Sequence, residues 1–288
     1  MKWHCNLFET IPLIGGDANV LVFSDLGKQF TYRHLVKTWI ANLRMEYPFC
    51  LLTMDGREVA AKELNILSLV GGTMDFFKDK HHAKQLIELM KFELEHSPEL
   101  IAIFTDLQTE LEKAFEQWVV EFEGIELQPS TETIQFEQLI KLAPIEVRPT
   151  TGEVLGAFEY QSFLLKSWLY LAHNKKTSVC FYDFPENELN PFEVKELFGI
   201  AKSHNCTVIC LTTCREVIGQ TELSNLHFIQ PNGDRYPIEQ LHEELKLFYT
   251  DPPEMLESFA KSLAYHDFRK DYTMLDPKWR EFLLSRTC

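Results

Sequence analysis

Residues that could bind nucleotide phosphates stand near the start of the chain. Gly27, Lys28 and Gln29 follow a buried apolar run, where the Gly-Lys-Ser/Thr of a phosphate-binding loop would fall. The first glycine of that motif is replaced by Val22, and the magnesium-binding hydroxyl is replaced by Gln29. Without the glycines the backbone cannot form an anion nest, and without Ser or Thr the metal loses a ligand. The pattern predicts a phosphate loop that has lost its nucleotide chemistry.

Other polar residues follow two later apolar runs. Asp183 ends one run, as the metal-holding acid of a P-loop enzyme does, and Thr212, Thr213 and Arg215 could imitate a sensor site after the next. One hypothesis is therefore a diverged NTPase that uses Lys28 and Asp183. No Ser/His/Asp, Cys/His or paired-carboxylate constellation stands out, and we expect that the protein is not an enzyme.

The elements that position these residues are organised around the stretch 175–183. This apolar, β-branched and aromatic run predicts a strand buried on both faces, and 207–213 is a second such run. Between them Asn190 and Pro191 mark a helix start. Strand, helix, strand at this spacing predicts a parallel βαβ unit at the centre of a sheet.

The rest of the chain completes an α/β pattern. Residues 3–7 predict a half-exposed edge strand, and a second β-α-β start is expected from a strand at 19–23, a helix at 29–44 and a strand at 49–54. Helical periodicity follows over 57–143. We predict a P-loop-NTPase-like, mostly parallel sheet with a large inserted α-helical domain. The expected domains are an α/β domain at 1–56 and 144–250, a helical insertion at 57–143, and a C-terminal helical extension at 251–288.

The longest predicted helix opens at Ser97 and Pro98. Its apolar residues step by four and three from Leu100 to Phe122, which predicts six turns ended by Gly124. Such a seam packs against other helices of the same chain or against a partner subunit. Both interpretations stay open.

Composition bounds the class of protein. The net charge of −15 argues against a general nucleic-acid coat but leaves room for a local basic patch, because charges are screened over about 8 Å. No apolar run approaches ~20 residues, so we expect no membrane span. Seven cysteines, several inside predicted elements, favour a reduced, cytoplasmic compartment. Cys206, Cys210 and Cys214 suggest zinc, but Cys206 and Cys210 would lie about 13 Å apart on a strand, which favours buried thiols.

An acidic run at 121–137 has two interpretations. A solvated loop explains it, and a calcium site would use the same carboxylate and carbonyl oxygens. No EF-hand loop spacing is present.

The order of parts resembles the Csn-two family, the DNA-end-binding adaptation proteins of type II-A CRISPR systems. The resemblance covers about residues 1–250. It is carried by 20–23, 139–143 (Leu-Ile-Lys-Leu-Ala), 145–148 (Ile-Glu-Val-Arg), 163–181, 192–199 and 207–212. The segment after 250 exceeds what shorter relatives have.

The resemblance implies a non-enzymatic homotetrameric ring that takes double-stranded DNA ends through a basic hole and supports spacer acquisition. Implied partners are the CRISPR integrase and the RNA-guided effector nuclease, and calcium is the implied cofactor. The implied DNA-binding residues are Lys141, Arg148 and Lys166, then Lys28, Arg33, Lys37, Lys175 and Lys176. The implied calcium ligands are Glu121, Glu123 and Glu126.

A ring also reconciles an acidic chain with DNA. Cations from each subunit converge on one hole, while the acidic outer surface limits random adhesion. If each subunit meets two phosphates, the ring neutralises about eight, and log affinity falls with log salt at a slope near −7. The alternatives are the diverged NTPase and a scaffold that binds only protein, through the long seam and the Trp279 helix.

Overall fold

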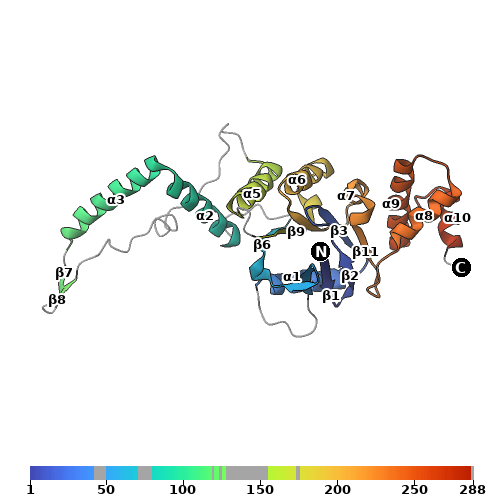
Figure 1. The fold of residues 1–288 in the computed structure, drawn as a ribbon, viewed down its shortest axis with the longest axis horizontal. Coiled ribbons are helices and arrows are strands. Elements are labelled where there is room, and N and C mark those ends of the chain that lie inside the picture. Colours follow the sequence, from blue (N-terminus) through green and yellow to red (C-terminus); the bar gives the residue numbers. More distant parts are fainter. Residues whose placement is uncertain are drawn as a thin grey trace. The chain divides into compact units, whose positions relative to one another are not determined.

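The chain forms two compact units in a computed structural model, residues 1–73 with 157–288, and residues 74–156 (Figure 1). The structure describes residues 1–41, 50–70, 80–118, 120–122, 125–127, 155–172 and 176–286. These units divide the chain at 73/74 and 156/157, whereas the predicted insertion spans 57–143.

A five-stranded parallel sheet forms the centre of the first unit. Its strands are β3 (Ala18–Phe23), β6 (Asn65–Val70), β9 (Ser178–Asp183), β10 (Thr207–Leu211) and β11 (Leu226–Ile229). Their spatial order is β11-β3-β10-β9-β6, which is 5-1-4-3-2 when the five are numbered along the chain. The predicted α/β class with a parallel sheet is confirmed.

The predicted βαβ unit is present at the centre of this sheet. β9 and β10 pair in parallel with Val179 opposite Thr207, and α6 (Pro191–Ser203) connects them. Asn190 starts α6, because its side-chain oxygen accepts from the N–H groups of Phe192 and Glu193 while Glu193 bonds back to Asn190.

Different layers cover the two faces of the parallel sheet (Figure 1). One face carries Leu21, Phe181 and Ile209 and packs against α1 (Leu26–Ile40) and a second, antiparallel sheet. On the other side lie α5 (Ala157–Ala172), α6 and α7 (Arg215–Gln220). The strands are buried almost throughout because both faces are covered.

The antiparallel sheet corrects three expectations. It contains β1 (Lys2–Cys5), β2 (Phe8–Pro12), β4 (Cys50–Met54) and β5 (Arg57–Val59) in the order β2-β1-β4-β5. β1 is an internal strand and Trp3 is fully buried, so the predicted edge strand is wrong. β4 does not follow α1 into the parallel sheet, and residues 57–59 form β5 rather than the expected helix. Residues 65–70, which were also expected to be helical, form β6 of the parallel sheet.

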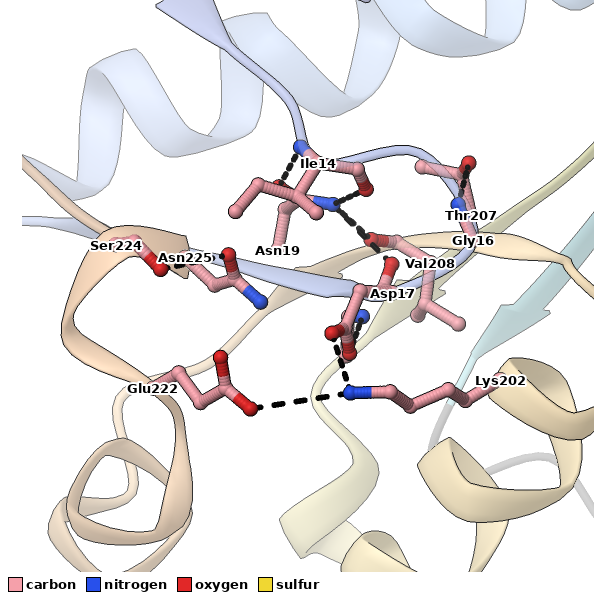
Figure 2. A network of polar contacts seen from close by, with 11 residues as sticks. Ile14, Gly16, Asp17, Asn19, Lys202, Thr207, Val208, Glu222, Ser224 and Asn225 are labelled. Carbon is pink, nitrogen blue, oxygen red and sulfur yellow. Dashed lines mark hydrogen bonds and ion pairs between the residues drawn. The ribbon is translucent and has the colours of Figure 1, made fainter.

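A polar network closes the amino edge of the parallel sheet (Figure 2). The buried Asn19 side chain accepts from the Ile14 N–H at 2.8 Å and donates to the carbonyls of Ile14, Asp17 and Val208. Lys202 of α6 pairs with Asp17 at 2.6 Å. The turn before β3 is therefore bonded to both β10 and α6.

Three helices follow β11 and pack in series. They are α8 (Ile238–Phe248), α9 (Pro253–Arg269) and α10 (Pro277–Ser285). The buried Asp267 carboxylate of α9 accepts from Tyr236 at 2.7 Å and from Tyr272 at 2.6 Å. These contacts tie α9 to the segments before α8 and before α10. α9 and α10 lie within the segment 251–288 that was expected to be a C-terminal helical extension.

One buried histidine lies in β11 without a hydrogen-bond partner. His227 is 1% exposed, and neither ring nitrogen has a partner in the described part of the chain. Burial lowers the pKa of His227 to about 3, with a further contribution from Arg235.

The second unit contains a helix pair and a short hairpin. Its elements are α2 (Lys80–His96), α3 (Pro98–Glu116), β7 (Val120–Phe122) and β8 (Ile125–Leu127). α3 starts at Ser97 as predicted but ends at Glu116, and Phe122 lies in a strand, so the six-turn helix is wrong at its end. No residue of α3 is buried among the residues that the structure describes.

Candidate functional site

The connection from β3 to α1 contains no phosphate cradle. Only Ser24 and Asp25 lie between the strand and the helix, whereas a phosphate loop needs about six residues there. Asp25 caps α1, because its carboxylate accepts from the N–H of Gly27 at 2.7 Å and of Lys28 at 3.3 Å. A carboxylate of the chain therefore occupies the helix N-terminus where a phosphate would bind.

Asp183 at the end of β9 is also engaged. Arg33 of α1 pairs with it, with 2.7 Å between Nε and Oδ2, and the two side chains are 24% and 16% exposed. The guanidinium also lies over the Phe184 ring, 5.4 Å from its centroid. Burial raises the pKa of the Asp183 carboxyl above its usual value, and Arg33 and Lys37 offset part of that rise.

The residues expected to imitate a sensor site hold local structure instead. Glu186 accepts from the backbone N–H of Thr213 at 2.8 Å, and the Thr212 hydroxyl accepts from the Cys214 N–H at 3.0 Å. Arg215 donates to the Ser262 hydroxyl of α9 at 3.0 Å. At the carboxyl edge of the sheet, among the described residues, the groups that would bind a nucleotide are already hydrogen-bonded or ion-paired to other groups of the chain.

Two of the predicted DNA-binding lysines meet in one hollow, which we call the basic hollow. It encloses about 710 Å³ between the end of α5, the start of β9 and the end of α6. Its lining residues are Lys166, Leu169, Tyr170, Ala172, Lys176, Thr177, Ser178, Ser203, His204 and Asn205.

The basic hollow carries uncompensated positive charge. Lys166 is exposed and has no ion pair or hydrogen bond within the described residues. Lys176 is exposed and donates to the Lys62 carbonyl at 2.8 Å, which satisfies one N–H and leaves the charge unpaired. No lining residue is a carboxylate. In a chain of net charge −15, this hollow can hold an anion such as a phosphate.

Three other predicted cations that the structure describes are not brought to this hollow. Lys28, Arg33 and Lys37 lie on α1, where Arg33 is paired, Lys37 is exposed and Lys28 approaches the Leu7 carbonyl at 3.5 Å. The remaining three lie outside the described residues: Lys141, Arg148 and Lys175.

The described acidic residues do not assemble a calcium site. Glu121 of β7 and Glu126 of β8 are exposed and lie directly opposite each other in the hairpin, and Glu123 lies outside the described residues. No group of three or more His, Cys, Asp or Glu side chains could hold a metal among the residues that the structure describes. Two carboxylates supply fewer oxygens than the six to eight or so that calcium takes.

The three cysteines that suggested zinc differ in their exposure to solvent. Cys206 and Cys210 are buried around β10, and Cys214 is half-exposed at the start of α7. Burial raises the pKa of all three thiols. Neutral, buried thiols do not bind metal readily.

Sequence reasoning missed the polar residues that line the hollow beside the two lysines, and it missed the cap of α1. Asp25 was recognisable, because a carboxylate directly before a helical stretch is a helix-start signal. His204 and Tyr170 had no such signal, since the hollow joins segments about thirty residues apart that meet where α5 packs beside α6.

The comparisons with known proteins concern the fold. The chain is similar to Stu0660 of Streptococcus thermophilus over 100% of both chains, with a TM-score of 0.66 and 11% identity. Two structures of ABC-transporter components are more distant. One is MJ1267 in its ADP conformation, with a TM-score of 0.40 and 12% identity over 79% of this chain and 82% of that chain. The other is cbiO1 of Clostridium perfringens, with a TM-score of 0.39 and 12% identity over 95% of this chain and 90% of that chain.

No family model and no curated protein matches the sequence. Among the described residues no helix is both long and apolar enough to cross a membrane. The chain therefore shares its fold, along its whole length, with Stu0660.

Proposed function

We propose that this protein is a non-enzymatic, DNA-end-binding ring protein that supports CRISPR spacer acquisition. In this proposal it acts in the cytoplasm as a homotetramer with the CRISPR integrase and the RNA-guided effector nuclease. The family resemblance of the sequence suggests these partners, and the full-length fold likeness to Stu0660 supports the fold part of that resemblance.

The basic hollow is the observation that carries the proposal. Two lysines converge there, and the lining of the hollow contains no carboxylate, although acidic residues outnumber basic ones by 43 to 28 in the chain. Such a site attracts phosphate groups, and lysine contacts to phosphates dominate the affinity of most DNA-binding proteins. Four copies in a ring supply the charge that one subunit lacks.

The carboxyl edge of the sheet counts against the diverged NTPase. Hydrolysis through Lys28 and Asp183 requires a phosphate on the α1 N-terminus and a metal on Asp183. Asp25 bonds to the helix N-terminus, and Arg33 pairs with Asp183. A nucleotide must break both contacts before it binds.

The helix α3 supports assembly with other subunits. Leu100, Ile103 and Leu107 are 42%, 63% and 45% exposed on it. Exposed apolar residues at helical spacing favour a protein contact. The same face also suits the protein-only scaffold, so the decisive observation is DNA binding.

The test measures mass in solution and compares linear with closed circular duplex in mobility-shift assays. The proposal predicts a tetramer that retards linear duplex and leaves closed circles unshifted. Replacing Lys166 and Lys176 together with Glu should abolish the shift, whereas Lys195→Glu, at an exposed lysine outside the hollow, should keep it.

Other outcomes favour the alternatives. Assembly with partner proteins but no shift of linear duplex supports the scaffold. Nucleotide turnover that disappears in Asp183→Ala supports the NTPase. Parallel assays with calcium and with a chelator test whether the predicted calcium dependence exists.

A further inference from the structure

Two cysteines of the antiparallel sheet lie directly opposite each other. Cys5 is the last residue of β1 and Cys50 is the first residue of β4, and the register pairs these two positions. Opposite residues of antiparallel strands have Cα atoms about 4.5–5.5 Å apart. A disulfide spans about 4.4–6.8 Å between Cα atoms, so the strand geometry brings the two residues within bonding range without backbone movement.

The two thiols already interact. Both are free and buried, at 3% and 2% exposure, and their side chains are hydrogen-bonded to each other. This contact lowers the pKa of Cys5 and raises that of Cys50, so Cys5 is the better thiolate of the pair.

No other described cysteine is paired with a cysteine in the strand register. Cys180 of β9 pairs with Val208, and Cys210 of β10 pairs with Tyr182, so neither faces a cysteine in the register. Burial raises the pKa of both thiols. Cys214 is half-exposed and hydrogen-bonds to Glu216. The register singles out Cys5 and Cys50.

We propose that Cys5 and Cys50 form a reversible disulfide when the protein meets a small-molecule disulfide such as glutathione disulfide. The Cys5 thiolate attacks one sulfur of the oxidant, which expels one glutathione thiolate and leaves a mixed disulfide on Cys5. The Cys50 thiol gives up its proton and attacks the Cys5 sulfur, which releases the second glutathione. Two protein thiols are oxidised, and one glutathione disulfide is reduced to two thiols.

The position of the pair at the ends of both strands provides access. Terminal ladder positions open more readily than the centre of a sheet, and this opening exposes buried thiols to a small oxidant. The bond encloses residues 6–49, which include β2, β3 and α1. Oxidation therefore links the end of β1 covalently to the start of β4. It closes a loop that contains Gly27, Lys28 and Gln29, the position where a phosphate-binding loop would fall.

The experiment exposes the full chain to buffers of increasing glutathione disulfide to glutathione ratio. Free thiols are trapped with N-ethylmaleimide in acid, and peptides are mapped by mass spectrometry. We expect a Cys5–Cys50 cross-link with a mass loss of two hydrogens, reversed by dithiothreitol. The Tm of the oxidised protein should rise by about 5–10 °C, because the closed loop restricts the unfolded chain.

Matched variants separate this pair from the other thiols. Cys50→Ser should stop at a glutathione adduct on Cys5, whereas Cys210→Ser should keep the cross-link. The proposal is overturned if Cys5 and Cys50 stay alkylatable while Cys214 takes up glutathione, or if the cross-link forms only in urea. The mapping on the unmutated protein decides the matter even if a variant fails to fold, and it does not depend on DNA binding.

Discussion

Replacing Lys166 with Gln should change the salt dependence of DNA binding by a calculable amount. Lys166 is exposed and unpaired within the described residues, so its removal should leave stability nearly unchanged, within about 0.5 kcal/mol. If Lys166 and Lys176 each meet one phosphate in every subunit of a tetramer, the ring contacts about eight phosphates. Each contact contributes about 0.9 to the slope of log affinity against log salt.

The substitution removes four of those contacts. The slope should fall from about −7 to about −3.6, and affinity at 0.15 M salt should drop about 1,000-fold, because each contact contributes about 0.7 log units there. Fluorescence anisotropy of labelled linear duplex, titrated between 0.05 and 0.3 M salt (roughly the range over which counterion release is measurable), gives both quantities. Lys195→Gln is the matched control and should keep the original slope.

One outcome would refute this reasoning. A Lys166→Gln protein that binds more weakly with an unchanged slope would show that Lys166 does not release counterions from phosphates. An unchanged affinity for DNA would show that the basic hollow does not contact DNA.

Three further predictions concern stability. Arg33→Met leaves the Asp183 carboxylate buried without its partner and should cost about 1–3 kcal/mol in urea unfolding, while adding Asp183→Asn should recover most of the loss; equal losses in both proteins would contradict this. His227 has its folded-state pKa depressed to about 3, so its contribution to stability is complete above pH ~6.5 and is lost as pH falls toward 3. Between pH 7 and pH 5 the unmutated protein should lose about 2 kcal/mol more than His227→Phe, and parallel pH profiles would contradict that. Gly16→Ala should destabilise by more than Gly56→Ala, because both glycines have positive φ but only a Cβ at Gly16 would collide with a neighbouring side chain, and thermal melts should separate them by about 1 kcal/mol or more.

The buried parallel strands could be predicted from the sequence because their composition is locally distinctive. Residues 178–183 and 207–211 are continuous apolar runs bounded by turn signals, and Asn190 with Pro191 marks the intervening helix start. These elements are determined by residues that are neighbours in the sequence, so the βαβ unit and the degenerate phosphate loop could both be predicted.

The antiparallel sheet could not be predicted in the same way. β1 pairs with β4 almost fifty residues later, and no local pattern names a partner at that distance. Trp3 alternates with polar neighbours as an edge-strand residue would, yet α1 and the parallel sheet bury it completely. β6 lies inside the stretch predicted to be helical, because the spacing of Ile66, Leu67, Leu69 and Val70 suits a helix as well as a buried strand.

The candidate site could be predicted only where it depends on residues that are adjacent in the sequence. The failed phosphate loop is a property of adjacent residues, and the structure adds the two carboxylate contacts that engage it. The basic hollow depends on the packing of α5 beside α6, which no local pattern indicates, and the resemblance to a family, not spacing, points to Lys166 and Lys176. The predicted end of the long helix is wrong because Trp118 and Phe122 continue the helical spacing of apolar residues beyond Glu116, where α3 ends.

The most direct test of the account is a mobility shift with the same duplex in linear and covalently closed form. The account predicts that the protein retards the linear form, and that Lys166→Glu with Lys176→Glu removes the shift. Equal retardation of both forms, or of neither, would contradict DNA-end binding.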